Sequence, residues 1–311
     1  MGNVSRRVLL LGGSGFLGRA LLSRLNRVGG WECRAPTSSE LDLTSLDASN
    51  RLAAMFGSEV TLVVAVRVRP SPDPYDTMQR DIRAVVEVAR ALGRRPVRLC
   101  VYFSSSAVYG DYPSRASITE DTPPSPTSVY GASKLAAEGI LHQAAARAAI
   151  PLLVLRPCMV YGPGDPSTAY GPMRFIKSIE REGTAVLLGD GSERRNLVFI
   201  DDLADWVCSL MSRREEGIFN VTAGPGYSHR EVLACLTRVV SKPFTVISVP
   251  RDRPAADVLM SSAKLDCVLP HRPITPLAEG LARTWTWLST RQPHGVNGVD
   301  PELPRNRDNQ P

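Results

Sequence analysis

The sequence predicts an α/β protein with a doubly wound parallel sheet and a smaller C-terminal lobe. Short apolar runs alternate with longer helical patterns through the first half of the chain, which is typical of strands buried on both faces of a parallel sheet. A glycine-rich turn joins the first run to the first helix. Past Arg156 the alternation loosens and Pro and Gly become frequent, which indicates the smaller lobe.

The individual elements follow from these patterns. Strands are expected at 8–11, 60–66, 97–103 and 152–155, and helices at 17–28, 77–92 and 130–149, with a further helix at 173–182. We expect the first domain at 6–160, also receiving roughly 196–222. The smaller lobe is expected at 161–195 and 223–290. The Pro-, Asn- and Asp-rich tail at 291–311 has the composition of a disordered segment.

Composition excludes several classes of protein. The 311 residues carry a net charge of +6, and no apolar run approaches the length of about 20 residues that spans a bilayer. We therefore expect a cytoplasmic protein without a membrane partner. The basic residues occur as dispersed pairs without interleaved aromatics, so no nucleic-acid partner is predicted. The six cysteines lie singly, outside metal-ligand spacing with the four histidines, which predicts reduced thiols and no metal site.

The glycine-rich turn predicts a dinucleotide site of the Rossmann type. Gly12, Gly15 and Gly18 would let the turn close, let backbone approach a pyrophosphate and let the following helix pack on the strand. The N-terminus of that helix would offer N–H groups to the anion. A P-loop is excluded, because Arg19-Ala20 stand where it needs Lys followed by Ser or Thr.

The end of the second strand decides which dinucleotide is preferred. NAD enzymes place an acid there and NADP enzymes a cation. Arg34, followed by hydroxyl residues, favours NADP, whereas Glu32 would favour the alternative, NAD. Asp42 either lies under the adenine or caps the helix that begins near Ser45.

Tyr130 and Lys134 form a candidate acid/base pair. A separation of four residues puts both side chains on one face of the helix. Lowering the pKa of a tyrosine from about 10 to about 7 requires roughly 4 kcal/mol of differential stabilisation, which a neighbouring ammonium and a cationic nicotinamide ring can supply together. The preceding strand ends in Ser104-Ser105-Ser106, which places hydroxyls at the sheet edge where ligands bind.

With these elements in order, the chain resembles the extended short-chain dehydrogenase/reductase family, the NAD-dependent epimerase/dehydratase type that modifies sugar nucleotides. The resemblance runs from about residue 7 to 288. It is carried by the glycine turn, the Ser-Ser-Ser-Ala-Val-Tyr-Gly strand end, Tyr130 with Lys134, Arg156-Pro157 with 160–165, and Gly189-Asp190-Gly191 leading to Arg195 and Asp201-Asp202.

The resemblance implies roles for particular residues. Tyr130 is the acid/base, Lys134 tunes it and holds the nicotinamide ribose, and Ser105, or alternatively Ser106, binds the reacting oxygen. The implied cofactor contacts are Gly12, Gly15, Phe16, Leu17, Gly18, Arg34, Asp42, Leu43, Ala65, Tyr130, Lys134 and Pro157. The implied substrate contacts are Ser105, Ser106, Met159 and two diphosphate-clamping arginines, Arg195 and Arg253. The family commonly dimerises through the helix that begins near Tyr130, so a homodimer is expected.

Departures from the family pattern reduce the set of reactions that the resemblance implies. Ser106-Ala107 replace the Asp-Glu pair of dehydratases, which argues against dehydration. Met159 stands where many members have an Asn, Met78 falls near another family Asn, and Asn196 replaces an Asp.

The leading hypothesis is a reductase in which NADPH reduces the 4-keto group of a deoxysugar nucleotide. The alternative is a nucleotide-sugar 4-epimerase with tightly bound NAD. A third hypothesis is a catalytically silent nucleotide-binding sensor or partner-binding protein.

Overall fold

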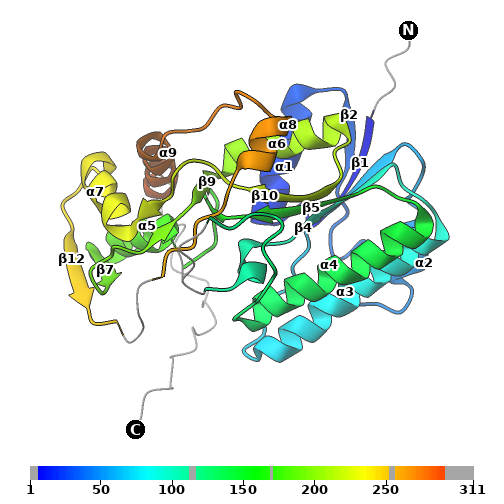
Figure 1. Cartoon of the computed structure of the whole chain (residues 1–311), viewed down its shortest axis with the longest axis horizontal. Coiled ribbons are helices and arrows are strands. Elements are labelled where there is room, and N and C mark those ends of the chain that lie inside the picture. The colour runs from blue at the N-terminus through cyan, green and yellow to red at the C-terminus, as the bar shows by residue number, and fades with distance from the viewer. Residues whose placement is uncertain (1–5, 112–116, 169–170, 252–255, 291–311) are drawn as a thin grey trace.

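The structure, a computed structural model, describes residues 6–111, 117–168, 171–251 and 256–290. A six-stranded parallel sheet runs through its larger part (Figure 1). The predicted α/β class with a doubly wound parallel sheet is confirmed, while the tail at 291–311 lies outside the described residues. In sheet order the strands are β10 (Gly217–Val221), β5 (Leu152–Pro157), β4 (Leu99–Phe103), β3 (Val60–Val64), β1 (Arg6–Leu11) and β2 (Trp31–Arg34).

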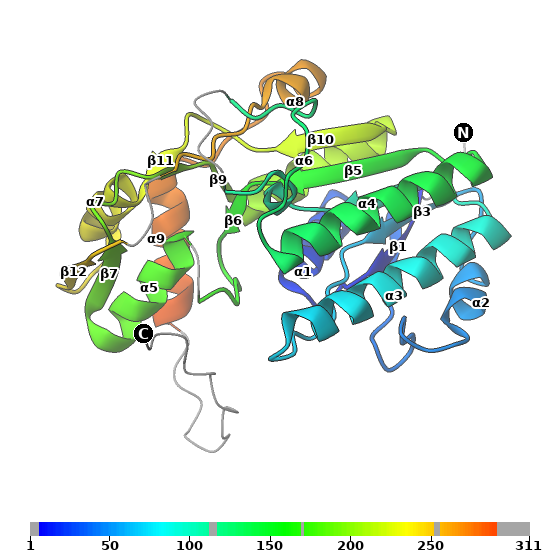
Figure 2. The ribbon, with the colours of Figure 1, turned by 60° about the horizontal axis from the view of Figure 1, so that its bottom comes forward.

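Helices cover both faces of this sheet. One face packs through Leu21 and Leu25 of α1 (Phe16–Val28) and Trp206 of α6 (Ile200–Arg213). The other face is covered by the long helices α3 (Pro74–Arg94) and α4 (Val129–Ala148), which lie side by side, and by the short α2 (Ala48–Ala53) (Figure 2). Both hydrophobic layers are closed, which explains why the strands are apolar without alternation.

Local capping fixes where the two long helices begin. The Asp73 side chain accepts a hydrogen bond from the Tyr75 amide at 2.9 Å, and Pro74 occupies the first position of α3. Ser128 caps α4 by accepting from the Gly131 amide at 3.1 Å. Helix α3 therefore begins three residues before the expected start at 77, because capping rather than apolar periodicity sets the boundary.

The order of the strands creates a crevice at one place. Strand β1 pairs with β2 on one side and with β3 on the other, so the chain direction across the sheet reverses at β1. Ligands of open α/β sheets bind outside the carboxyl ends of the strands at this switch point. The turns that follow β1 and β3 flank the crevice.

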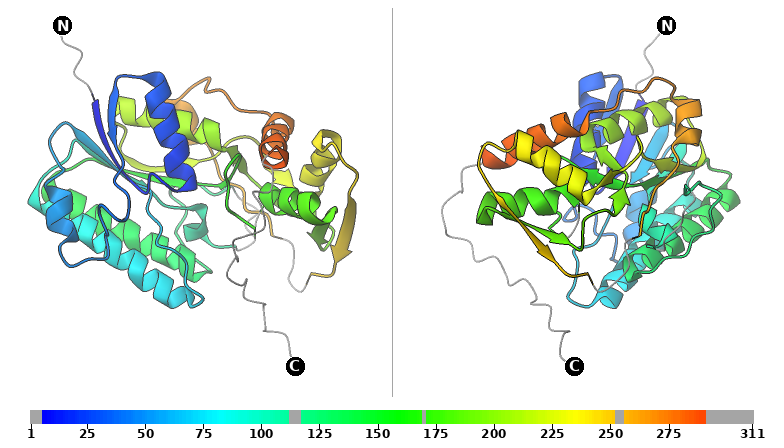
Figure 3. Two further views of the ribbon diagram at one scale, coloured as in Figure 1. Left: turned by 180° about the vertical axis from the view of Figure 1, so that it is seen from behind. Right: turned by 60° about the vertical axis from the view of Figure 1, so that its left-hand side comes forward.

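The smaller lobe lies beyond the carboxyl end of β5 and has its own core (Figure 3). Helices α5 (Gly171–Glu182), α7 (His229–Val239) and α9 (Leu277–Ser289) bury Phe175, Leu236 and Trp285 there. Its two-stranded sheets pair β6 (Met159–Tyr161) with β9 (Leu197–Phe199), β7 (Thr184–Leu188) with β12 (Thr245–Val249), and β8 (Arg194–Arg195) with β11 (Tyr227–Ser228). The remaining helices are the short η1 (Ser106–Tyr109) and α8 (Ala263–Val268).

Three further observations bear on partners. Within the described ranges, no helix is both long and apolar enough to cross a membrane. Those same ranges bring no three His, Cys, Asp or Glu side chains together as a metal site. Ala137 and Ala145 of α4 are buried in the second core layer, and Ala144 and Ala148 pack against it, so the alanine-rich face is largely used inside the chain. The homodimer stays a prediction.

Candidate active site

The glycine turn after β1 has no room for side chains. A Cβ atom on Gly12, whose φ is +88°, would lie 2.5 Å from the Ala65 carbonyl oxygen, and one on Gly18 would lie 2.1 Å from the Gly12 oxygen. The Gly15 amide closes the turn on the Gly12 oxygen at 3.0 Å. Gly15 also caps α1 without a side-chain hydrogen bond. The main-chain amides of the first turn of α1 are therefore available to an anion at the crevice.

Four other predicted cofactor contacts, Phe16, Leu17, Ala65 and Pro157, come from the segments that follow β1 and β3 and from the end of β5. Phe16 and Leu17 begin α1, and their half-buried side chains pack against the cores. Ala65 follows β3 and its amide donates to the Leu11 oxygen at 3.0 Å. Pro157 ends β5 and is buried. The cofactor contacts of Phe16 and Leu17 stay predictions.

Arg34 and Glu32 differ in their position along β2 and in their ion pairing. Arg34 is exposed and is the last residue of β2, whereas Glu32 lies two residues earlier and is paired with Arg7 of β1 at 3.0 Å. The carboxyl end of the strand thus carries a cation, and the acid is turned to the neighbouring strand.

Asp42 and Leu43 follow in the next loop. Asp42 accepts hydrogen bonds from the amide and hydroxyl of Thr44 at 2.8 and 2.7 Å, which closes a local turn. The expectation that Asp42 caps a helix beginning near Ser45 is wrong, because α2 begins at Ala48 and its N-cap residue is Asp47. The place of Asp42 under the adenine stays a prediction. Leu43 is buried and lines a small cavity beside Lys134.

Tyr130 and Lys134 stand in the first two turns of α4. The Lys134 ammonium donates to the Phe103 oxygen at the end of β4, at 2.8 Å, and lies 5.9 Å from the centre of the Tyr130 ring. It also lies 5.0 Å from the ring of Tyr102. Removal from water lowers the pKa of Lys134 to about 8. The pair predicted from spacing is thus brought to the carboxyl end of β4.

Two charged residues of the site escaped the sequence analysis. The Arg67 guanidinium lies 4.8 Å from the centre of the Tyr130 ring. Asp81 of α3 lines the small cavity with Lys134, accepts from the Val68 amide at 2.8 Å, and raises the pKa of Lys134 against the effect of burial. Asp81, one turn beyond Met78, is the α3 residue beside the lysine. Its place on the stripe of Thr77, Ala84, Val85 and Val88, four residues that are buried, was the available signal.

The three serines after β4 have different surroundings. Ser104 is buried and donates to Glu138. Ser105 caps η1, its oxygen accepting from the Ala107 amide at 3.1 Å, which leaves its hydroxyl proton to donate. Ser106 is half-buried. Ser105 and Ser106, the two candidates for the reacting oxygen, are therefore more accessible than Ser104.

A buried ion pair holds α4 against the sheet. Glu138, one turn after Lys134, accepts from Nε and Nη2 of Arg156 at 3.0 and 2.6 Å, and their side chains are only 8% and 3% exposed. Arg156 also donates to the Tyr109 hydroxyl at 2.8 Å, and that hydroxyl donates to Asn220 at 2.8 Å. The network links α4 to β5, η1 and β10, so it fixes the helix that carries Tyr130.

The expected substrate residues of the lobe have mixed surroundings. Met159 is half-buried and packs against Gly171, where a Cβ would lie 2.2 Å from its sulfur. Asn196 is buried, donating to the Gly224 oxygen at 3.0 Å and accepting from the Met260 amide at 2.7 Å, so it supports the lobe and not Arg195. Arg253 lies outside the described residues.

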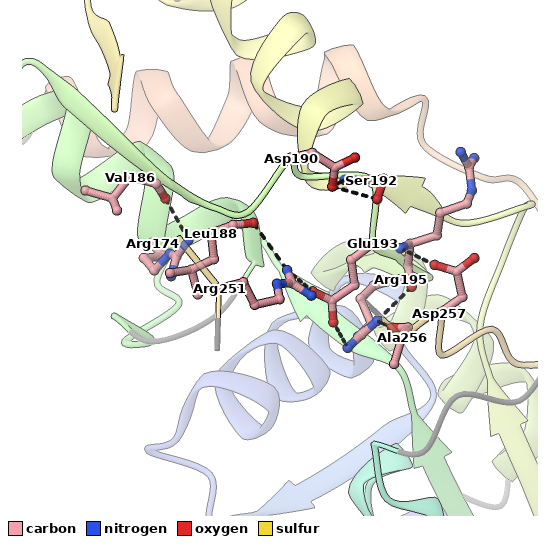
Figure 4. A network of polar contacts seen from close by, with 11 residues as sticks. Arg174, Val186, Leu188, Asp190, Ser192, Glu193, Arg195, Arg251, Ala256 and Asp257 are labelled. Atoms are coloured by element: carbon pink, nitrogen blue, oxygen red, sulfur yellow. Dashed lines mark hydrogen bonds and ion pairs between the residues drawn. The ribbon is translucent and has the colours of Figure 1, made fainter. Parts of the chain in front are cut away.

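Arg195 is part of a polar cluster in the lobe (Figure 4). Its guanidinium donates to the carbonyls of Ala256 and Arg194 and to Glu193. The other oxygen of Glu193 pairs with Arg251. Neither Arg251 nor Glu193 was singled out in the sequence, because Arg251 is far from the motif that carries Arg195 and an acid is not expected between diphosphate-binding arginines.

Comparisons with known proteins agree with this architecture. The model of the NAD dependent epimerase/dehydratase family matches residues 8–222. The UDP-glucose 4-epimerase of Mycolicibacterium smegmatis is 29% identical over 309 residues, covering 89% of this chain and 97% of that protein. The dTDP-L-rhamnose 4-epimerase of Burkholderia thailandensis is 33% identical over 187 residues, 57% of this chain and 50% of that protein.

Solved structures share the whole fold. MoeE5 in complex with UDP-glucose and NAD superposes with a TM-score of 0.77 at 28% identity, covering 91% of this chain and 98% of that one. RMD from Pseudomonas aeruginosa, complexed with NADPH, superposes with a TM-score of 0.81 at 23% identity, covering 91% and 99%. At that identity the second likeness concerns the fold alone.

Proposed function

This chain belongs to the NAD dependent epimerase/dehydratase family, and we propose that it is a nucleotide-sugar 4-epimerase. The observation that carries this proposal is Tyr130 beside Lys134 at the carboxyl end of β4, in a chain whose similarity to a UDP-glucose 4-epimerase extends over nearly both full lengths. The proposal replaces 4-keto reduction, the leading hypothesis from the sequence, because relatives with 4-epimerase activity support the alternative.

The crevice suits a nicotinamide dinucleotide. The glycine turn brings backbone close to the helix N-terminus, where a pyrophosphate would bind. Ala65 follows β3, and the amine of Lys134 reaches the end of β4. We expect this amine to hold the nicotinamide ribose. When bound, the nicotinamide ring supplies the hydride acceptor and donor.

Tyr130 is proposed to move the proton. Its phenolate takes the proton of the sugar 4-hydroxyl during oxidation, and the phenol so formed returns a proton to that oxygen during reduction from the opposite face. The cations of Lys134 and Arg67 stabilise the phenolate that is present before the oxidation and after the reduction. Ser105, whose proton is available, donates to the same sugar oxygen.

The lowered pKa of Lys134 predicts that activity is lost at alkaline pH. Because burial lowers this pKa to about 8, the ammonium that stabilises the phenolate is lost at a pH where an exposed lysine still keeps its proton. We expect kcat/KM to fall about tenfold per pH unit above pH 8. The measurement is a pH–rate profile with the protein shown to remain folded; a profile that stays flat to pH 10 would contradict this assignment.

A second candidate function is NADPH-dependent reduction of a 4-keto sugar nucleotide. It is favoured by Arg34, the exposed cation at the end of β2, together with the engagement of Glu32 by Arg7. A cation in that position suits the 2′-phosphate of NADP.

One experiment separates the two candidates. We expect the purified protein to release NAD on denaturation, detected by mass spectrometry, and to interconvert UDP-glucose and UDP-galactose, or the dTDP counterparts, without added reductant. If the protein instead takes up NADPH, consumes it stoichiometrically with a 4-keto sugar nucleotide and leaves the 4-hydroxy sugars unchanged, the reductase is the correct assignment.

A further inference from the structure

Glu193 joins two arginines of the lobe through its two carboxylate oxygens. Oε1 pairs with Nη2 of Arg195 and Oε2 with Nη2 of Arg251 (Figure 4). The three side chains are only 13%, 18% and 16% exposed, respectively. Ion pairs so sheltered from water are screened less than pairs on an open surface. The attraction in this bridge is therefore stronger than that of an exposed surface ion pair.

Each arginine is also anchored by backbone. Arg195 donates from its other terminal nitrogen to the oxygens of Ala256 and Arg194, and Arg251 donates to the Leu188 oxygen at 3.3 Å. In Arg195 the carbonyls engage Nη1 and leave Nη2 to Glu193, whereas in Arg251 the same Nη2 meets both the Leu188 oxygen and Glu193. The nitrogens that meet Glu193 therefore present a prearranged pair of donors to whichever anion lies between them.

The cluster carries more positive charge than Glu193 can neutralise. Arg174 donates to the Val186 oxygen at 2.8 Å, and no carboxylate pairs with it among the described residues. The Nδ1 atom of His229 is buried without a hydrogen-bond partner in the same described part of the chain, and Glu193 acts on its pKa. Burial opposes ionisation of Glu193, yet Arg195 and Arg251 outweigh it and lower the pKa of the carboxyl. Glu193 is thus an ionised group within a cationic cluster.

We propose that Glu193 is an internal stand-in for the substrate diphosphate, holding Arg195 and Arg251 together until the nucleotide sugar displaces it. The proposal deepens the proposed function and rests on it for the chemical class of the ligand, a nucleoside diphosphate. A carboxylate with one oxygen on each guanidinium imitates two phosphoryl oxygens.

The stand-in has two opposite effects. It keeps two poorly exposed arginines from being left without an anion when the site is empty. It also weakens nucleotide binding, because the diphosphate must break both ion pairs before forming its own. Because substrate and product carry the same diphosphate, Glu193 lowers the affinity for both, and it therefore also speeds product release.

The test replaces the carboxylate by an amide of the same shape. Glu193→Gln removes the negative charge and leaves an acceptor oxygen for one arginine. We expect this variant to bind UDP about tenfold more tightly than wild type by titration calorimetry, since one or two charge-assisted bonds no longer need to be broken. The KM for the nucleotide sugar falls with it, and kcat stays the same or decreases.

Three further proteins complete the design. Glu182→Gln removes one exposed carboxylate at the end of α5 and is expected to bind UDP as wild type does, which controls for net charge. Arg251→Met weakens UDP binding, and adding Glu193→Gln to it produces a smaller gain than in wild type, because one of the two pairs is already absent. Thermal melting of each variant shows that it is folded.

The outcomes are distinct. If UDP binds wild type, Arg251→Met weakens that binding, and Glu193→Gln binds no tighter than wild type, then Glu193 only orients the arginines. The stand-in is then wrong, while the nucleotide-sugar substrate class survives. If neither wild type nor Glu193→Gln binds UDP or dTDP although both hold the dinucleotide, the stand-in and the nucleotide-sugar function fail together.

Discussion

Replacing Tyr130 by Phe is expected to lower kcat about 10³-fold, the size of effect that a positioned acid/base provides. The ring that packs near Lys134 and Arg67 stays, and only the hydroxyl that carries the proton is lost. The dinucleotide should still bind, because the glycine turn and the strand ends are untouched. Steady-state turnover and dinucleotide titration measure the two properties separately.

Tyr75→Phe is the matched control, because it removes a tyrosine hydroxyl from an exposed position at the start of α3. We expect its turnover to equal that of wild type. Should Tyr130→Phe also turn over at the wild-type rate, Tyr130 is not the proton carrier. A wild-type protein that binds the dinucleotide yet transforms none of the candidate sugars would point to the third hypothesis, a silent sensor.

Replacing Glu138 by Ala is expected to cost about 3–5 kcal/mol of unfolding free energy, because it leaves the Arg156 guanidinium buried without its partner. The Ser104 hydroxyl loses its acceptor as well. Urea unfolding of the protein at a fixed excess of dinucleotide measures the loss, since bound cofactor also stabilises the folded state.

Two comparisons give this prediction its meaning. Glu182→Ala, on the exposed end of α5, should change the unfolding free energy by less than about 0.5 kcal/mol. Adding Arg156→Met to Glu138→Ala should recover part of the loss, since the unpaired charge is then gone. A loss below 1 kcal/mol for Glu138→Ala would mean that water or another group satisfies Arg156, and that α4 is held by its apolar contacts alone.

Local signals predicted most of the fold. The expected strand at 8–11 lies within β1, and the helix expected at 130–149 matches α4 within a residue at each end. The predictions were less accurate for element boundaries that hydrogen bonding sets. The apolar run reaches 66, but β3 ends at Val64, because Val64 is the last residue paired with both neighbouring strands. An apolar run indicates burial, but it does not show at which residue the hydrogen bonding between neighbouring strands ends.

The candidate site divides in the same way. Gly12, Gly15 and Gly18 and the Tyr130–Lys134 pair act over a few residues of one turn or one helix, so their spacing alone predicts their arrangement. Arg67 and Asp81 reach the pair from other segments, and only the packing of α3 on α4 brings Asp81 near the lysine.

By itself the sequence determined the parallel sheet, the glycine turn at the crevice and the helix that places Tyr130 beside Lys134, because short-range periodicity, glycine geometry and one helical turn encode them. Tertiary structure alone decided which charges act on one another. Glu138 of α4 pairs with Arg156 of β5, and Glu193 joins Arg195, its near neighbour in the sequence, to the distant Arg251. Electrostatic interaction depends on distance and burial in the folded chain, and neither can be read from positions along the sequence.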